Sequence, residues 1–355
     1  MFWIKRTLHF LFSFYFILSV FFLVIFWLGF IPLSDDQHPI QEFLFGYEEE
    51  GFVFYPITHR NYFFGITLLV LVLFIMVLLV LRANWRNAKI LSQKNQIILD
   101  SNKKITSSIQ YAKRIQSGLL PSENMIKTCF TQSFILYQPR DIVSGDLYWL
   151  AKIGNLKLVA AIDCTGHGVP GAFLTIMAHR GLNKIVLEKG IHHPSDILFQ
   201  LHKEIYSAFR QNGESAGNDG MEIGICLINS EKSALTFSSA NLPLYHVAET
   251  KIEKLKGSRL SVGSESIDFS GPNPFTCTEI EYKPADTFYM FSDGFADQFG
   301  GPSDRKFLSA NLQKYLLEIS SFPLDNQKEK LAQKLSDWMG NQIQTDDILG
   351  IGFQA

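Results

Sequence analysis

Two long apolar segments occupy the N-terminal end of the chain, and only short apolar runs follow them. Residues 10–31 carry no charged side chain, and residues 62–81 are equally apolar. Either segment is long enough to cross about 30 Å of hydrocarbon as an α-helix. The pattern predicts a two-helix transmembrane hairpin over residues 1–82, with a short loop at about 32–61. A cleaved signal peptide is the alternative for the first segment, but the apolar run is too long and no small-residue cleavage motif follows it.

Charged residues around these segments predict their orientation. Lys5 and Arg6 precede the first segment, and the second is followed by Arg82 and Arg86. The loop between them is acidic, with Arg60 as its one basic residue. Because basic residues favour the cytoplasmic side, both termini are expected in the cytoplasm, with the chain crossing the cytoplasmic membrane twice.

Residues 83–120 contain no Gly or Pro before Gly118 and predict a helical linker. One apolar position recurs every seven residues, at Leu91, Ile98, Ile105, Ala112 and Leu119. The companion positions are mostly polar, at Asn95, Asn102, Ile109 and Gln116. The pattern favours a marginal parallel coiled coil, and therefore a homodimer through the linker. A solvated amphipathic spacer and a basic helix lying against anionic lipid are the alternatives. Pro121 is expected to end the helix.

From residue 121 onward the pattern changes to short β-like runs interrupted by helical ones, which predicts a separate domain at 121–355. The expected strands are 134–138, 147–153, 156–162, 223–228, 234–238, 287–291 and 348–353. The expected helices are 170–188, 194–210, 303–319 and 325–340. Neighbouring strands with segregated helices indicate an α+β fold of sandwich type.

Acidic residues stand at the ends of several expected strands. Asp163 and Asp293 each end an apolar run before a glycine-containing turn, and Asp346 and Asp347 precede the last run. Asp146 stands between Gly145 and another apolar run. Two carboxylates about 4 Å apart repel by roughly 4 kcal/mol at an effective dielectric near 20, so a cluster of them requires cations. Oxygen ligands select hard ions such as Mg²⁺ or Mn²⁺. Taken singly, each residue is more typical of an ordinary turn or helix cap than of a metal ligand.

Composition narrows the alternatives. The formal net charge is only −2, which gives no indication of nucleic-acid binding. The four cysteines have no CxxC or zinc-like spacing, as expected of thiols in a reducing cytosol. His192, His193 and His202 have no carboxylate at ligand spacing and are expected on the surface.

Six motifs in order resemble the metal-dependent protein phosphatases of the protein phosphatase 2C superfamily. They are PRDIVSGDLYW, DCTGHGVPGAF, NDGMEIGICLI, SANLPLYHV, SDGFADQFGG and TDDILGIGF, and the likeness covers about residues 120–355. It is closer to the bacterial branch typified by stage II sporulation protein E. The segment IQYAKRIQSGLLPS also resembles the helix that leads into such domains. The resemblance implies a two-sheet antiparallel β-sandwich flanked by helices.

The resemblance also implies a binuclear site for two Mn²⁺ or Mg²⁺ ions. Asp163 is then expected to bridge the ions, with the backbone carbonyl of Cys164 as a further ligand and with Asp293 and Asp346 completing the site. Asp146 is expected to act through water on a metal. Asp219 is either a ligand of an accessory third ion or a plain turn residue.

Two departures concern substrate phosphate. The histidine that eukaryotic-type members place two residues after the bridging Asp is Thr165 here, and His167 lies two residues further on. His167 is therefore either a phosphate or proton-transfer residue or a part of the loop's structure. Arg140 is either a phosphate ligand or a residue in an ordinary salt bridge.

The function expected is hydrolysis of phosphoserine or phosphothreonine on a cytoplasmic regulatory protein, in signalling or partner switching. Analogy with the branch suggests a phosphorylated protein like an anti-sigma-factor antagonist. The alternatives are a weak or inactive membrane-bound module that binds a phosphoprotein, and a metal phosphodiesterase acting on nucleotides. The latter lacks any nucleotide-binding loop in the sequence.

Overall fold

The computed structural model describes residue 19 and residues 59–210, 219–263 and 269–355. The first predicted membrane segment and almost all of the predicted loop lie outside the described residues. The chain divides into two compact units, 1–88 and 89–355.

Helix α3 (His59–Ser117) contains the second predicted membrane segment. Among the described residues, its apolar N-terminal part is the one stretch long and apolar enough to cross a membrane by length and composition. Side chains such as Leu79 and Trp85 are exposed along it. An exposed apolar helix of this length is what a bilayer, but not water, would stabilise.

The second unit is built on two five-stranded antiparallel sheets. The first has the order β1-β12-β9-β6-β7 and the second β2-β3-β4-β5-β8. The strands of the first sheet are β1 (Ser133–Gln138), β6 (Leu244–Ala248), β7 (Lys251–Leu255), β9 (Thr287–Phe291) and β12 (Ile348–Gln354). Those of the second are β2 (Asp146–Ile153), β3 (Leu156–Cys164), β4 (Met221–Asn229), β5 (Ala234–Ala240) and β8 (Cys277–Glu281). A small hairpin joins β10 (Phe299–Gly300) to β11 (Arg305–Lys306).

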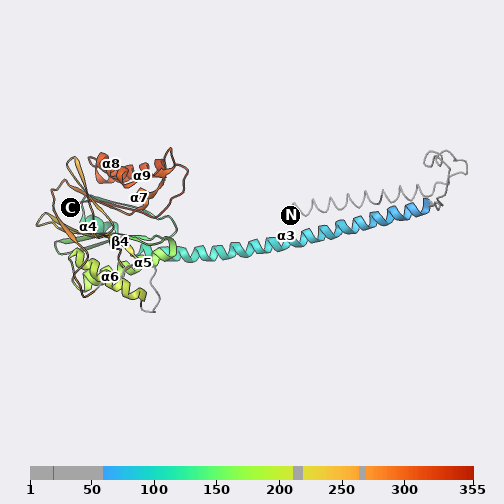
Figure 1. Cartoon of the computed structure of the whole chain (residues 1–355), viewed down its shortest axis with the longest axis horizontal. Coiled ribbons are helices and arrows are strands. Elements are labelled where there is room, and N and C mark those ends of the chain that lie inside the picture. Colours follow the sequence, from blue (N-terminus) through green and yellow to red (C-terminus); the bar gives the residue numbers. More distant parts are fainter. Residues whose placement is uncertain (1–18, 20–58, 211–218, 264–268) are drawn as a thin grey trace. The chain divides into compact units, whose positions relative to one another are not determined.

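Helices cover the outer face of each sheet, and Figure 1 shows the resulting four layers. Helices α5 (Gly168–Asn183) and α6 (Pro194–Arg210) pack on the second sheet, with the π-helical turn η1 (Lys184–Glu188) continuing α5. Helices α8 (Ser309–Ile319) and α9 (Leu324–Met339) pack on the first sheet. Short helices α4 (Glu123–Cys129) and α7 (Gly294–Asp297) complete the set.

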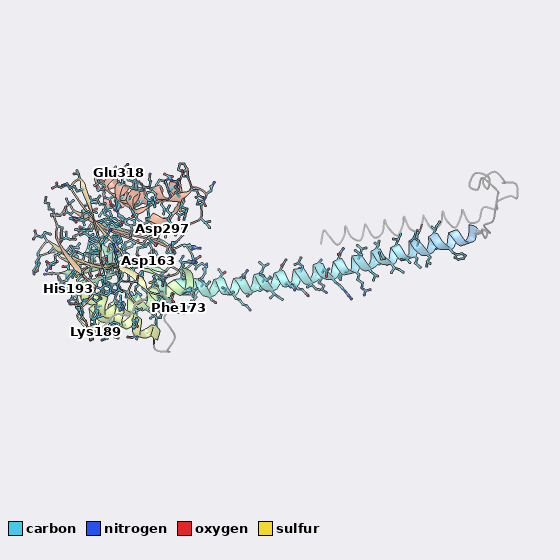
Figure 2. All side chains as sticks on the ribbon, viewed as in Figure 1. Asp163, Phe173, Lys189, His193, Asp297 and Glu318 are labelled. Carbon is cyan, nitrogen blue, oxygen red and sulfur yellow. The ribbon has the colours of Figure 1, made fainter. Side chains whose placement is uncertain are left out.

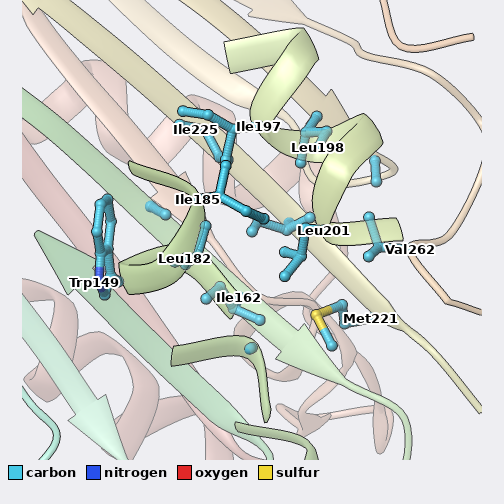
Figure 3. Packing of buried hydrophobic residues seen from close by; sticks show 14 of the residues in the cluster. Trp149, Ile162, Leu182, Ile185, Ile197, Leu198, Leu201, Met221, Ile225 and Val262 are labelled. Carbon is cyan, nitrogen blue, oxygen red and sulfur yellow. The ribbon is translucent and has the colours of Figure 1, made fainter. Parts of the chain in front are cut away.

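Three apolar clusters hold these layers together, and most strands of the two large sheets contribute to two of them by alternation. Figure 3 shows the cluster in which Leu182 and Ile185 meet Leu198 and Leu201 over Ile162 of the second sheet. A second cluster lies between the sheets, where Phe288, Leu349 and Phe353 of the first sheet are fully buried. Side chains alternate along a strand, so every second residue of each strand faces this inner space. The acidic residues predicted at the strand ends stand at the border of the same space.

The architecture confirms the predicted α+β fold with antiparallel sheets and flanking helices. All seven predicted strands exist. The edge strands β7 and β8 were missed because they carry many polar residues, and the short inner strand β6, between β9 and β7, was missed as well. The helix predicted at 303–319 begins only at Ser309, since residues 305–306 form β11. The linker helix ends at Ser117, before Pro121. The surface position predicted for His202 is wrong, because this side chain is fully buried.

Candidate functional site

Three acidic residues form a row across one end of the second sheet. Asp146 on β2 is the register partner of Asp163 on β3, and Asp163 is the partner of Glu222 on β4. Directly opposed residues project to the same face of a sheet. Alternation with Leu150, Ala161 and Cys226, which lie in the cluster between the sheets, places this face on the inside of the sandwich.

The opposite sheet supplies two further carboxylates at the same end. Asp293 follows β9 and Asp346 precedes β12, two strands that pair with one another. The backbone N–H of Asp293 donates to the carboxylate of Asp163, which joins the two sheets at this point. Figure 2 shows Asp163 within the domain between the helical layers. The structure thus brings four of the acidic residues predicted from the sequence, Asp146, Asp163, Asp293 and Asp346, into mutual electrostatic interaction.

The pKa values of these carboxyl groups record the crowding. Burial and the neighbouring Asp163 carboxylate raise the pKa of Asp146 well above its usual range. Burial, Asp293 and Glu222 do the same to the pKa of Asp163. Desolvation at the crowded rim, followed by repulsion from Asp346, raises the pKa of Asp293, while Lys306 opposes the shift. Negative charge at this edge therefore exceeds the local positive charge, which is the condition that a bound cation relieves.

Asp347 has a different environment from its neighbour Asp346. Its Oδ1 accepts the backbone N–H of Arg140 at 2.7 Å, and its Oδ2 accepts that of Gly145 at 2.7 Å. The side chain of Asp347 thereby closes the loop that leads into β2. Asp346 is half-buried, and its Oδ1 accepts the N–H of Asp347 at 2.8 Å. Asp347 thus anchors a loop, whereas the Asp346 carboxylate interacts with Asp163 and Asp293.

Asp146 is also held from several sides. Ser292 donates its hydroxyl to Asp146 Oδ2 at 2.7 Å, and the N–H of Asp146 donates to Ser144 Oγ at 3.0 Å. Ser292 in turn accepts the N–H of Leu349 at 2.9 Å. One hydroxyl therefore connects the ends of β9, β12 and β2.

Glycines allow the turn after β3 to approach its neighbours. A Cβ on Gly145 would lie 2.6 Å from the carbonyl oxygen of Gly166, and one on Gly171 would lie 2.3 Å from the same atom. Both distances are too short for any side chain. The start of α5 and the loop before β2 thus pack directly on the turn that follows Cys164, at Gly166.

Thr165 stands where eukaryotic-type relatives place a histidine, and its role here is structural. Its N–H and hydroxyl both donate toward Gly220 O, at 2.9 and 3.2 Å, and its Oγ1 accepts the N–H of Gly220 at 3.0 Å. These bonds tie the turn to the start of β4. Asp219, the preceding residue, is exposed.

Arg140 and His167 lie around the same edge. One guanidinium N–H of Arg140 donates to Thr345 O at 2.9 Å, beside the loop that carries Asp346. His167 Nδ1 lies 2.7 Å from Asp141 Oδ2, and both side chains are about half exposed. Asp141 therefore orients the imidazole, a contact that the sequence analysis did not anticipate.

Two residues that the sequence analysis missed belong to this edge, Glu222 and Ser292. Glu222 was hidden in an otherwise apolar strand, MEIGICLIN, where a single charged residue at an inward position was the available signal. Ser292 carried no signal, because a serine before Asp-Gly is ordinary turn composition.

The donor set at this edge fits a hard divalent cation, since its side-chain donors are carboxylate oxygens and the Cys164 carbonyl lies in the adjoining turn. In this conformation, no group of three or more His, Cys, Asp and Glu among the described residues is arranged to hold a metal ion. The carboxylates are thus gathered at one edge without being arranged as a ligand set in this conformation.

Comparison with known proteins agrees with this architecture. A family model described as Stage II sporulation protein E (SpoIIE) matches residues 155–354. The solved SiaA-PP2C domain of Pseudomonas aeruginosa is 30% identical, with a TM-score of 0.65 over 72% of this chain and 98% of that chain. The PP2C phosphatase domain with a fragment of the regulatory domain of the cell fate determinant SpoIIE from Bacillus subtilis is 18% identical, with a TM-score of 0.50 over 63% of each chain. No curated protein matches the sequence. The chain therefore belongs to the stage II sporulation protein E family, and its second unit is a metal-dependent serine/threonine phosphatase domain of the protein phosphatase 2C type.

Proposed function

We propose that this protein is anchored in the cytoplasmic membrane and dephosphorylates serine or threonine on a cytoplasmic regulatory protein, using two Mn²⁺ or Mg²⁺ ions. The observation that carries the proposal is the set of facing carboxylates at the open end of the sandwich, whose charge is not locally compensated. Repulsion between these carboxylates destabilises the fold unless a cation offsets their charge. The membrane anchor rests on the apolar part of α3 and on the charge pattern of the flanking segments.

The ions would be held by Asp163, Asp293 and Asp346, with the Cys164 carbonyl as a further ligand. When bound, such ions offset charge on a phosphoryl group and ready a water molecule for in-line attack on phosphorus. Asp146, which is buried and accepts the hydroxyl of Ser292, would act through water bound to a metal ion. Glu222 holds additional negative charge beside Asp163 and would strengthen cation binding. A third ion would require Asp219, whose exposed position at the start of β4 permits a ligand role.

The substrate side of the site would include Arg140 and His167. His167 is oriented by Asp141, so its imidazole can hold the phosphate or give a proton to the leaving oxygen. Arg140, placed by Thr345 and Asp347, adds a planar donor group at the rim. The family relationship favours a phosphorylated partner-switching protein, such as one like an anti-sigma-factor antagonist, as the substrate.

The test is Mn²⁺-dependent phosphate release from a phosphoserine peptide by the full-length protein in detergent, beside the Asp293→Asn variant. We expect the wild-type protein to be active and EDTA to abolish this activity. The activity of Asp293→Asn should be lower than that of the wild type by about a hundredfold or more, since a lost ligand removes charge stabilisation from the transition state. Binding of the phosphopeptide without turnover in Mn²⁺ would instead favour the second function, a membrane-bound phosphoprotein-binding module.

A further inference from the structure

The last turns of helix α3 belong to the second unit, residues 89–355, which carries the acidic residues and is called the catalytic unit below. Between Lys89 and Ser108 the side chains are exposed, whereas Ile109 and Ala112 are partly covered and Gln116 is only 4% exposed. These positions are three, four and seven residues apart, so they lie on one face of the helix. Leu120, just beyond the helix, packs against the cluster between α5 and the second sheet.

Gln116 pairs with the backbone of a single residue in the loop before β2. Its Nε2 donates to Ser144 O at 2.7 Å, and its Oε1 accepts the N–H of Ser144 at 3.1 Å. The Nε2 also donates to Thr175 Oγ1 of α5 at 2.9 Å. The side-chain amide of Gln116 thus satisfies both backbone polar groups of Ser144, its N–H and its C=O, as a neighbouring strand would in a sheet. Ser144 is fully buried, so these groups could not bond to water instead.

Ser144 is connected by hydrogen bonds and by its neighbour Gly145 to two of the carboxylates, Asp146 and Asp347. Ser144 Oγ accepts the N–H of Asp146, and the next residue, Gly145, donates its N–H to Asp347. A shift of Ser144 would therefore move Asp146 relative to Asp163, its register partner. At Ser144 the loop has no regular strand partner, so Gln116 supplies the hydrogen bonds to both backbone groups of this residue, while Asp347 holds Arg140 and Gly145 on either side of it.

We propose that Gln116 is a positioning residue for the phosphatase reaction, acting on Asp146 through Ser144, and that the catalytic unit accordingly begins within the linker helix. The inference rests on the proposed phosphatase function. A purely structural role is the competing explanation: Gln116 would then fill space and add stability, with no effect on turnover by the folded protein.

The variant Gln116→Met separates these explanations, because Met has a similar volume and helix propensity but cannot hydrogen-bond both Ser144 groups. Gln110→Ala, at an exposed position of the same helix, is the matched control. In the full-length protein in detergent with Mn²⁺, we expect Gln116→Met to lower kcat by roughly tenfold to a hundredfold, the cost of a small misplacement of an active-site group. The KM for the phosphopeptide should change little, because Gln116 does not reach the substrate side of the site.

Amide hydrogen exchange measured by mass spectrometry provides a readout that needs no activity. The peptide containing Ser144 to Asp146 should exchange faster in Gln116→Met than in the wild type or Gln110→Ala, while peptides from β9 and β12 stay protected. Faster exchange together with reduced kcat supports the proposal. Unchanged exchange in this peptide, or full kcat despite a loosened loop, overturns it. An inactive wild type would refute the phosphatase function alone, and the exchange result would then still decide whether Gln116 holds the loop.

Discussion

The adjacent residues Asp346 and Asp347 allow the sharpest test of the site, because the structure gives them different tasks. In Asp347→Asn, one carboxylate oxygen becomes an NH₂ group facing a backbone N–H, of either Arg140 or Gly145. One of two charge-assisted hydrogen bonds at 2.7 Å is lost, and two donors oppose each other. Hydrogen bonds to charged groups contribute about 1.5–3 kcal/mol each. Burial raises the pKa of Asp347, so its charge is already costly there, and we expect a loss near the lower end, about 2 kcal/mol.

The neighbouring substitution Asp346→Asn should behave in the opposite way. Its carbonyl oxygen can still accept the N–H of Asp347, so that bond survives. The substitution also removes a negative charge that raises the pKa values of Asp163 and Asp293. In EDTA this variant should therefore be as stable as the wild type or slightly more stable. It should nevertheless lose the stabilisation that Mn²⁺ gives, which is about 2.7 kcal/mol at a hundredfold excess over Kd.

Thermal unfolding of the full-length protein in detergent, with EDTA and with Mn²⁺, measures both effects. A loss of about 2 kcal/mol corresponds to a Tm lower by roughly 4–8 °C for a domain of this size. The reasoning fails if Asp346→Asn is the destabilised variant in EDTA, or if it keeps the full Mn²⁺-induced rise in Tm.

Three further predictions concern the same edge. Glu222→Gln should raise the Mn²⁺ concentration needed for half-maximal phosphatase activity by about tenfold, since one charge beside Asp163 is lost; an unchanged metal titration would remove Glu222 from the site. Gly171→Ala should lower activity and stability by about 1–3 kcal/mol, because its Cβ would overlap Gly166 O; a wild-type Tm and kcat would show that α5 moves without cost. Burial raises the pKa of Asp146 and Asp163 in the folded state above the ordinary 3.8, so the folded protein holds these protons more tightly. The stability they contribute is present below the ordinary pKa of about 4 and is lost as the pH rises toward the raised values, so the Tm in EDTA should fall as the pH is raised above about 4. A Tm that rises over this range would contradict the crowding.

Much of the phosphatase domain could be predicted from the sequence because its central strands are strongly apolar. The run VAAID predicted β3 and its terminal acidic residue, since a buried strand and a polar end give a clear boundary. The edge strand β7 reads KIEKL, in which Lys251 and Glu253 face solvent, so its composition resembles a loop. Edge strands are polar because exposed apolar edges would associate, and periodicity alone therefore underestimates a sheet at its margins.

The sequence predicted the acidic residues of the site, but it did not predict the hydrogen bonds that hold them in place. Asp163 and Asp293 stand at strand ends beside glycine-containing turns, a local pattern that a sequence displays. The bond from Ser292 to Asp146 joins residues 146 positions apart, and those from Asp347 to Arg140 and Gly145 join residues more than 200 apart. Such contacts depend on the register of β12 against β1 and β9, which no local pattern specifies.

The linker helix is a second case in which the sequence pattern is not sufficient. Some residues of its heptad pattern contact the phosphatase domain, so they cannot also pair with a second helix. Ala112 and Gln116 continue the two predicted seams of the coiled coil, yet Ala112 is partly covered and Gln116 is buried and bonded to Ser144. A residue whose amide is bonded to Ser144 cannot also face a second helix. A coiled coil between two copies can therefore use the seam only as far as Ile105, where the side chains are exposed. Cysteine at Ile98 or Ile105 should then form disulfide-linked dimers in membranes, whereas cysteine at Ala112 should not. Crosslinking at all three positions with equal yield would mean that the end of α3 leaves the domain, and absence of crosslinking at Ile98 and Ile105 would exclude the dimer.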